Sequence, residues 1–349
     1  MWLSCLPGYT QTCIDINRNF RLGMEARAAW AQPCGKRQRA MSKQLKFNVN
    51  GNHFVHDGGF DSLVSFVQAA ERLGYDNIRL VDHVVGIMAE EHPDLPPTPY
   101  THKSQFQEVF TFMAYLSAIT TRIGFLTGVL GLPQRQTALV AKQAAQVDCM
   151  SKGRLTLGIG IGYNHIEFET LGEDFKTRGA RVEEQVEVLR ALWTQEVVNF
   201  EGRWHTLRHV NVNPRPVQRP IPIWMGAGRQ AQPVPPPKVV ERIGKYADGF
   251  MPLFRINEST GKLEDDALAS LAEIRRIGTS SGRDMARFQL ELGLYPHGKS
   301  ADRVLEEIAY LESVGATHIH ARFPDRGLDE QIAFLQDFAS VRASHLAAK

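Results

Sequence analysis

Short runs of apolar and β-branched residues alternate with longer runs of helical apolar spacing from Leu45 onward. The short runs predict strands at residues 45–50, 77–82, 122–127, 154–160, 222–225, 248–253, 288–293 and 317–322. The longer runs predict helices at residues 61–73, 108–120, 137–150, 178–193, 238–246, 263–277, 301–314 and 328–341. Strict alternation predicts a parallel sheet, and this number of units in about 300 residues favours a closed (β/α)8 TIM barrel over an open doubly wound sheet.

Two long stretches interrupt this alternation. Residues 83–107 follow the second predicted strand and are rich in proline. Their large apolar side chains are Ile87, Met88, Tyr100 and Phe106. Because the loops after the strands build the active site of a barrel, this insertion is a candidate lid or substrate wall. Residues 197–220 precede the fifth strand, at the opposite end, and Glu201-Gly202 predicts a hairpin turn in what we interpret as a structural flap.

Three glycines alternate with apolar residues where the fourth predicted strand ends, at Gly158, Gly160 and Gly162. Glycine at a strand end lets backbone N–H groups approach a phosphate or a flat ring closely. A Rossmann pyrophosphate turn needs GxGxxG directly before a helix, with an acid about 20 residues later. This chain has GxGxG, and residues 164–177 intervene before the next predicted helix. The other alternative is a strand end whose glycines only allow tight packing.

Other predicted strand ends carry candidate chemistry as well. The second strand ends in Asp82 and His83, where the imidazole could donate to a ring atom or exchange a proton near neutral pH while Asp82 orients it. Small residues follow two further strands, at Thr127-Gly128-Val129 and Gly226-Ala227-Gly228. Because the C-terminal ends of barrel strands meet at one mouth, these positions predict one extended ligand with a ring and a phosphate.

Composition and charge exclude several classes of function. The net charge of +2 does not indicate a nucleic-acid partner, and no run of about 18 apolar residues predicts a membrane span. The 4 cysteines lack CxxC spacing, and only Cys149 lies beyond the first forty residues. We therefore expect neither a metal site nor a disulfide scaffold, and a cytoplasmic location.

The first 41 residues differ from the rest of the chain. They contain Arg18, Arg21, Arg27, Arg37 and Arg39. No apolar segment of the signal-peptide kind accompanies them. We interpret residues 1–41 as a disordered arm or as the product of a misassigned start codon, with a basic targeting or docking arm as the alternative. Residues 42–349 then form a single barrel domain.

The chain resembles the bacterial luciferase-like oxidoreductases, in particular those that use the deazaflavin coenzyme F420. The resemblance covers residues 46–253 strongly and the remainder weakly. It rests on AERLGYDNIRLVDHV, AYLSAITTRIGFLTGVLGLPQRQTALVAKQAAQVDCMSKGRLTLGIGIGYNHIEFETLG, RGARVEEQVEVLRALW, PRPVQRPIPIWMGAG and YADGFMP. It implies a (β/α)8 barrel, in agreement with the alternation, and suggests a homodimer.

The resemblance also implies a role for each matching position. His83, beside Asp82, would lie near the reactive ring, and Gly128-Val129 match a non-prolyl cis peptide that bulges under that ring. The other cofactor-binding positions are Ile161, Gly162 and Asn164 along the pyrimidine side and ribityl chain, Gly226, Ala227 and Gly228 near the phosphate, and Thr127 and Gly160. Arg178 or Arg181 is a candidate partner for the phosphate, and the alternative for both is a solvated helical turn.

Two departures from the family pattern change the expectations. Tyr163 stands where some deazaflavin-dependent relatives carry an acid, which weakens the interpretation as a sugar-phosphate dehydrogenase. Residues 229–238 include four prolines where most relatives run directly into a helix, so this helix is expected to start late.

The implied activity is hydride transfer between coenzyme F420 and an unidentified organic substrate, with His83 as proton donor or acceptor. The apolar residues of the candidate lid suggest an apolar or aromatic substrate. An FMN-dependent monooxygenase and a non-catalytic flavin-binding protein remain alternatives. A metal-dependent hydrolase is a third, although His53 and His56 do not form an HxH pair after the first strand.

Overall fold

The computed structural model describes residues 44–51, 59–98, 100–229, 231–324 and 326–347. The arm expected at residues 1–41 lies outside these residues, as do His53 and His56.

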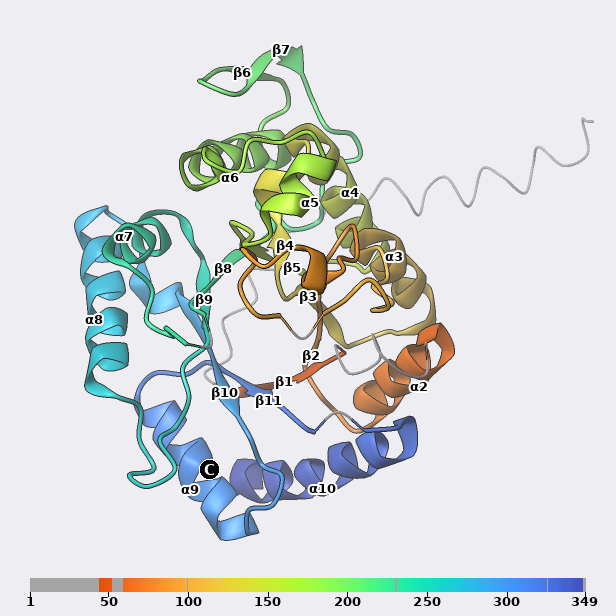
Figure 1. Ribbon diagram of the computed structural model, residues 1–349, viewed down its shortest axis with the longest axis vertical. Coiled ribbons are helices and arrows are strands. Elements are labelled where there is room, and N and C mark those ends of the chain that lie inside the picture. Colours follow the sequence, from red (N-terminus) through yellow and green to blue (C-terminus); the bar gives the residue numbers. More distant parts are fainter. Residues whose placement is uncertain (1–43, 52–58, 99, 230, 325, 348–349) are drawn as a thin grey trace, which may run out of the picture. The chain divides into compact units, whose positions relative to one another are not determined.

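Parallel strands close into a barrel in the described part of the chain, which confirms the predicted fold (Figure 1). The strands are β1 (Lys46–Asn50), β2 (Asn77–Leu80), β3 (Gly124–Thr127), β4 (Leu130–Gly131), β5 (Leu155–Gly160), β8 (Ile223–Ala227), β9 (Gly249–Pro252), β10 (Gln289–Leu294) and β11 (His318–Ala321). β3 and β4 share one position in the barrel, because both pair with β5. The ring closes where β1 pairs with β11, with Phe47 opposite Ile319.

A ring of helices surrounds the strands. The helices are α2 (Gly59–Arg72), α3 (Val109–Ile119), α4 (Thr137–Met150), α5 (His165–Thr170), α6 (Arg178–Thr194), α7 (Pro237–Tyr246), α8 (Asp265–Ser280), α9 (Ala301–Ser313) and α10 (Leu328–Ala347). Their apolar faces pack on the outer faces of the strands, with Phe47, Phe66 and Trp193 fully buried. Figure 1 shows α10 beside α2, so the last helix lies next to α2 just as the last strand pairs with β1.

The helix after β8 starts late, as expected, because Pro236 caps α7 and Pro237 is its first residue. The largest differences from the prediction among the helices concern α5 and α10. The short helix α5 lies inside a segment that the sequence pattern leaves without a helix. The last helix continues to Ala347, beyond the expected end at residue 341.

The predicted hairpin is present as β6 (Val198–Glu201) and β7 (Thr206–Val210). The Glu184 carboxylate of α6 accepts hydrogen bonds from the backbone N–H groups of Arg203, Trp204 and His205 at 2.8–2.9 Å. His205 Nε2 lies 2.6 Å from the hydroxyl of Thr137, the first residue of α4. The flap is therefore fastened to the outside of α4 and α6.

The part of the barrel interior farther from the mouth, here called the lower interior, holds a connected group of polar side chains. Arg79 of β2 donates to Glu291 of β10 at 3.1 Å and lies 3.2 Å from His320 Nδ1 of β11. Asn48 of β1 donates to the other carboxylate oxygen of Glu291 at 2.7 Å. Since β2 and β10 are not neighbours in the sheet, these side chains meet inside the barrel. Side chains alternate along a strand, so residues two and four positions further on face the same interior, closer to the mouth.

Candidate active site

A backbone bulge in the third barrel position forms the floor of the mouth. The Gly128–Val129 peptide bond between β3 and β4 is cis, as the resemblance implied. The Gly128 carbonyl accepts a hydrogen bond from Arg79 Nη2 at 3.4 Å, so the bulge stands directly above the buried polar group. A Cβ atom at Gly128 would lie 2.1 Å from Arg79 Nε, which explains why this position has no side chain.

Inward-facing glycines make room for the Val129 side chain. A Cβ atom at Gly160 would lie 2.6 Å from Val129 Cγ2, and one at Gly226 would lie 2.5 Å from Val129 Cγ1. One at Gly158 would lie 2.0 Å from the Thr127 carbonyl oxygen. Packing around the chain's own bulge therefore requires glycine at these positions. This agrees with the alternative in which the glycines allow tight packing. Whether the glycine backbone also contacts a cofactor stays a prediction.

His83 is held by a carboxylate that the sequence pattern did not indicate. Its Nδ1 lies 3.3 Å from Glu167 Oε2. Glu167 also accepts hydrogen bonds from the backbone N–H of Val84 at 2.6 Å and from Gln134 Nε2 at 2.9 Å. Burial acts to raise the pKa of Glu167, but the hydrogen bonds from His83, Val84 and Gln134 outweigh it and lower that pKa overall. An ionised carboxylate here fixes the imidazole with Nδ1 toward α5.

The expectation that Asp82 orients His83 is wrong. The Asp82 carboxylate accepts a hydrogen bond from Arg135 Nη2 at 2.6 Å and lies 3.4 Å from the Gly131 N–H. Neighbouring residues of an extended chain point to opposite sides, so Asp82 faces the segment after β4 while His83 faces the mouth. Burial raises the pKa of Asp82, although Arg135 acts in the opposite direction.

Aromatic side chains surround the His83 ring. The rings of Tyr100 and Phe106, both from the insertion, lie 5.3 and 4.8 Å from the imidazole centroid, and Tyr163 lies 6.0 Å from it. The Tyr163 hydroxyl is 3.0 Å from the Thr98 hydroxyl. The expected lid therefore covers His83 and lines an apolar pocket beside it. Ile87 also lines this pocket, whereas Met88 is 44% exposed.

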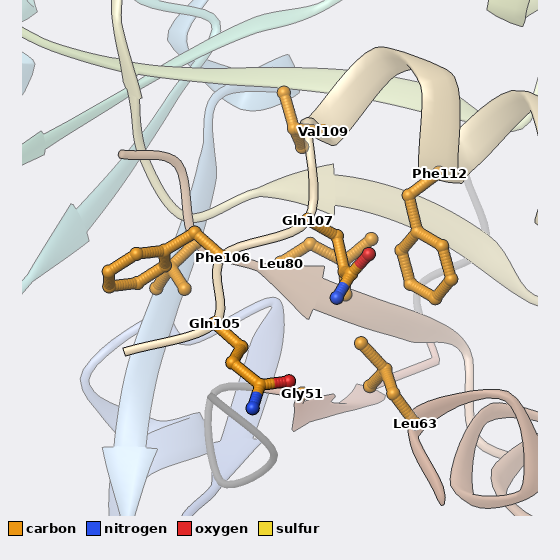
Figure 2. Close-up of a pocket in the computed structure, with 9 residues that line it drawn as sticks. Gly51, Leu63, Leu80, Gln105, Phe106, Gln107, Val109 and Phe112 are labelled. Atoms are coloured by element: carbon orange, nitrogen blue, oxygen red, sulfur yellow. The ribbon is translucent and has the colours of Figure 1, made fainter. Parts of the chain in front are cut away.

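The end of the lid is seated on the first two barrel strands. Figure 2 shows the chain from Gln105 to Val109 crossing the ends of β1 and β2 beside Leu80, with Phe106 and Phe112 on opposite sides in this view. Leu63 of α2 completes the apolar wall. This packing holds Phe106 in its position against His83.

Arginines gather at the other side of the mouth, where the phosphate was expected. Burial lowers the pKa of Arg178, the first residue of α6, and the charge of nearby Arg229 acts in the same direction. Arg178 Nε is buried and has no hydrogen-bond partner among the described residues. Arg229 follows Gly228, whose φ of 105° requires glycine. Arg181, the alternative candidate, is paired with Glu173, so the chain leaves Arg178 as the available partner.

The other expected positions all lie at the mouth, yet several side chains there have structural contacts. Thr127 Oγ1 donates to the Gly158 carbonyl at 2.6 Å. The Asn164 side chain caps α5 by accepting from the Glu167 N–H at 3.3 Å. Gly162 has a φ of 73° and packs against Phe168. Ile161 and Ala227 are half-buried at the ends of β5 and β8.

Sequence reasoning missed Glu167 and Arg229. Asn164 followed three residues later by Glu167 is a capping-box pattern, and it could have revealed α5 and placed the acid in the first turn of a helix. Arg229 has no comparable sequence signal, because its significance comes from its proximity to Arg178.

Comparisons with known proteins identify the family of this chain. A family model described as luciferase-like monooxygenase matches residues 44–340. An F420-dependent glucose-6-phosphate dehydrogenase of Amycolatopsis mediterranei is 29% identical over 194 residues, which cover 54% of this chain and 52% of that relative.

Two solved structures have the same fold. Monooxygenase RslO1 from Streptomyces bottropensis aligns with a TM-score of 0.68 at 19% identity, over 86% of this chain and 100% of that one. An F420-dependent secondary alcohol dehydrogenase, solved with an F420-acetone adduct, aligns with a TM-score of 0.64 at 16% identity, over 84% and 98%. At these identities the likeness establishes the fold alone. Among the described helices, none is both long and apolar enough to cross a membrane.

Proposed function

This chain belongs to the luciferase-like monooxygenase family, and we propose that it catalyses hydride transfer between coenzyme F420 and an organic substrate. One observation carries the proposal. His83 is fixed by a buried carboxylate and is covered by the aromatic lid, at the same mouth of the barrel as the Val129 bulge. A small apolar or aromatic substrate under the lid would lie against the imidazole.

The mouth fits a cofactor that has a flat ring and a phosphate. Val129 and the glycines around it form a surface without other side chains, on which a ring can lie. Arg178 and Arg229, with the N-terminus of α6, supply positive charge for a phosphate. When bound, a deazaflavin supplies hydride transfer at a ring carbon without oxygen activation.

The residues of the chain divide the remaining work. Glu167 accepts a hydrogen bond from the Nδ1–H group of His83. Nε2, at the opposite edge of the ring, is therefore the nitrogen that donates a proton to the substrate or accepts one from it. Tyr100 and Phe106 exclude water from this side and strengthen electrostatic interactions there. Val84 and Gln134 hold Glu167 in place, which keeps the imidazole in one orientation.

A fluorescence-quench titration with F420, and separately with FMN, tests the choice of cofactor. We expect micromolar binding of F420, at least tenfold tighter than that of FMN, and weaker binding in the Arg178→Gln and Arg229→Gln variants. Arg208→Gln, an exposed change on β7, is the control. Preferential binding of FMN, with oxygen consumption when the flavin is reduced, would favour an FMN-dependent monooxygenase instead.

The role of His83 is tested by following oxidation of reduced F420 with a panel of carbonyl compounds. His83→Ala should lower kcat by about 10²–10⁴-fold with F420 binding retained, as for loss of a general acid–base group. His209→Ala, on the flap, should leave kcat unchanged. Full activity of His83→Ala would remove the imidazole from the mechanism.

A further inference from the structure

A second group of side chains faces the mouth from the last three barrel strands. Glu291 of β10 and His320 of β11 point into the interior, where they contact Arg79. Tyr295 and Arg322 lie four and two residues further along the chain, each one residue beyond the end of β10 or β11. The Arg322 N–H still donates to the Leu294 carbonyl at 2.9 Å, so the alternation of side chains continues and directs both into the interior nearer the mouth. Arg255 lies three residues beyond the end of β9, beside the Tyr295 ring.

Arg322 is placed to bind a ligand and is only partly used by the protein. Its Nη1 donates to the Tyr295 hydroxyl at 2.8 Å, and its guanidinium lies 5.5 Å from the Tyr295 ring centroid. Its Nε is buried and has no hydrogen-bond partner among the described residues. Gly293 lies beside it, with 3.7 Å between that Nε and a Cβ atom built on the glycine, so the wall of the barrel leaves space there.

Arg255 and Arg322 place two positive charges near the Tyr295 ring. The Arg255 guanidinium lies 5.5 Å from the Tyr295 ring centroid, and Arg255 is exposed. In the described part of the chain no carboxylate pairs with either arginine, whereas Arg79 below them pairs with Glu291. Burial lowers the pKa of Arg79; Glu291 acts in the opposite direction, and the positive charge of Arg322 acts with burial. A group that brings one negative charge would relieve this repulsion.

We propose that Arg322 and Tyr295, with Arg255 at the rim, bind an anionic group of the substrate, most simply a carboxylate. Arg322 offers a planar set of N–H donors that matches the two carboxylate oxygens. Because the Tyr295 hydroxyl accepts its hydrogen bond from Arg322, its own proton remains available to donate to the same anion. The proposal rests on the proposed function, since it names the substrate class of that site.

The order of the strands assigns this site to the substrate rather than to the cofactor phosphate. Arg178 and Arg229 follow β5 and β8, whereas Arg322 follows β11, which only β1 separates from the strand that precedes His83. Arg79 lies near both Tyr100 of the lid and Tyr295, because either tyrosine in its phenolate form would raise the pKa of Arg79. A substrate whose apolar part lies under the lid thus places its carboxylate at Arg322, so the substrate class is an apolar or aromatic carboxylate.

Benzoate and neutral benzamide, which have the same shape, test the proposal by calorimetric titration of the full chain with and without F420. We expect benzoate to bind at least tenfold tighter than benzamide, and added salt to reduce the difference. Arg322→Gln should remove the preference, Arg322→Lys should keep part of it, and Tyr295→Phe should weaken benzoate severalfold. Arg208→Gln is the control, and melting temperatures report on folding of each variant.

The outcomes separate the two proposals. Equal binding of the two probes, or unchanged benzoate binding in Arg322→Gln, would overturn the anion site. Weakened F420 binding in Arg322→Gln with unchanged benzoate binding would also overturn it, by assigning the arginine to the cofactor. Failure of the chain to bind F420, with a benzoate preference that depends on Arg322, would retain the anion site and overturn the proposed function.

Discussion

The lower and upper interiors of the barrel are built on the same strands but differ in how their polar groups are satisfied. Below the bulge, Arg79 and Glu291 form a buried pair to which Asn48 and His320 add contacts. Above it, Arg322 keeps a buried nitrogen without a partner in the described residues. Burying a charge is costly unless it is paired. The side chains of the lower group therefore satisfy one another and hold the interior in one arrangement, whereas the proposed ligand supplies the missing partner of the upper group.

The largest expected effect comes from breaking the lower pair. Arg79→Met leaves the Glu291 carboxylate buried without its cation and should lower the free energy of unfolding by about 3–5 kcal/mol, measured by urea denaturation. Adding Glu291→Gln should recover part of this loss, because the amide is uncharged and still accepts from Asn48.

Arg322→Met is the matched comparison in the upper interior. It leaves no carboxylate behind and removes one hydrogen bond to Tyr295, so it should cost less than about 1.5 kcal/mol. Equal losses for Arg79→Met and Arg322→Met would contradict the distinction between the two layers.

Filling the space around the bulge is expected to destabilise the chain less than Arg79→Met does. Gly226→Ala places a methyl group 2.5 Å from Val129 Cγ1 and should destabilise the chain by about 1–3 kcal/mol. Val129→Ala in the same chain should relieve the collision. Gly293→Ala is the control, since its nearest contact is 3.7 Å away, and it should change stability by less than about 0.5 kcal/mol. Thermal unfolding compares the variants, and an equally large loss from Gly293→Ala would disprove the packing explanation.

The last stability prediction concerns the acid that holds His83. Glu167→Gln should lower the free energy of unfolding by about 1–2 kcal/mol near neutral pH, because the amide cannot serve all three donors as a carboxylate does. The pKa of Glu167 is lowered below its ordinary value of 4.5, so the ionised form stabilises the fold above that value. This stabilisation is lost as the pH falls through the lower pKa of the folded state.

Melting temperatures of the wild type and Glu167→Gln, measured from neutral pH down into this acidic range, check the sign. The difference between the two proteins should shrink on acidification. A difference that grows instead would show that the carboxylate is protonated in the folded state.

Most of the fold could be predicted because long elements repeat their pattern many times. The prediction for α4 agrees with both observed ends, Thr137 and Met150, and the hairpin turn at Glu201-Gly202 is present. The helix α5 could not be recognised by periodicity, since its 6 residues are too few to define an apolar face.

The positions of the candidate site could be predicted better than their contacts. The strand ends locate His83 and the glycines at one mouth, because parallel strands present the same end there. Adjacency in sequence gave the wrong partner for His83, since strand alternation turns Asp82 away from it and the contact comes from Glu167, 84 residues along the chain. That no carboxylate pairs with Arg322 among the described residues depends on which acids lie near it in space, and no local pattern records that.

The hydrogen bond from the Val84 N–H to Glu167 has a consequence for the order of events in a catalytic cycle. It ties Val84, the second residue of the lid, to the same carboxylate that holds His83. A motion that admits substrate while this hydrogen bond is kept would hinge beyond Val84, and the imidazole would keep its orientation while Tyr100 and Phe106 move. Opening and closing of the lid would then set the rate of substrate entry and product release, while the proton-transfer group needs no rearrangement between turnovers.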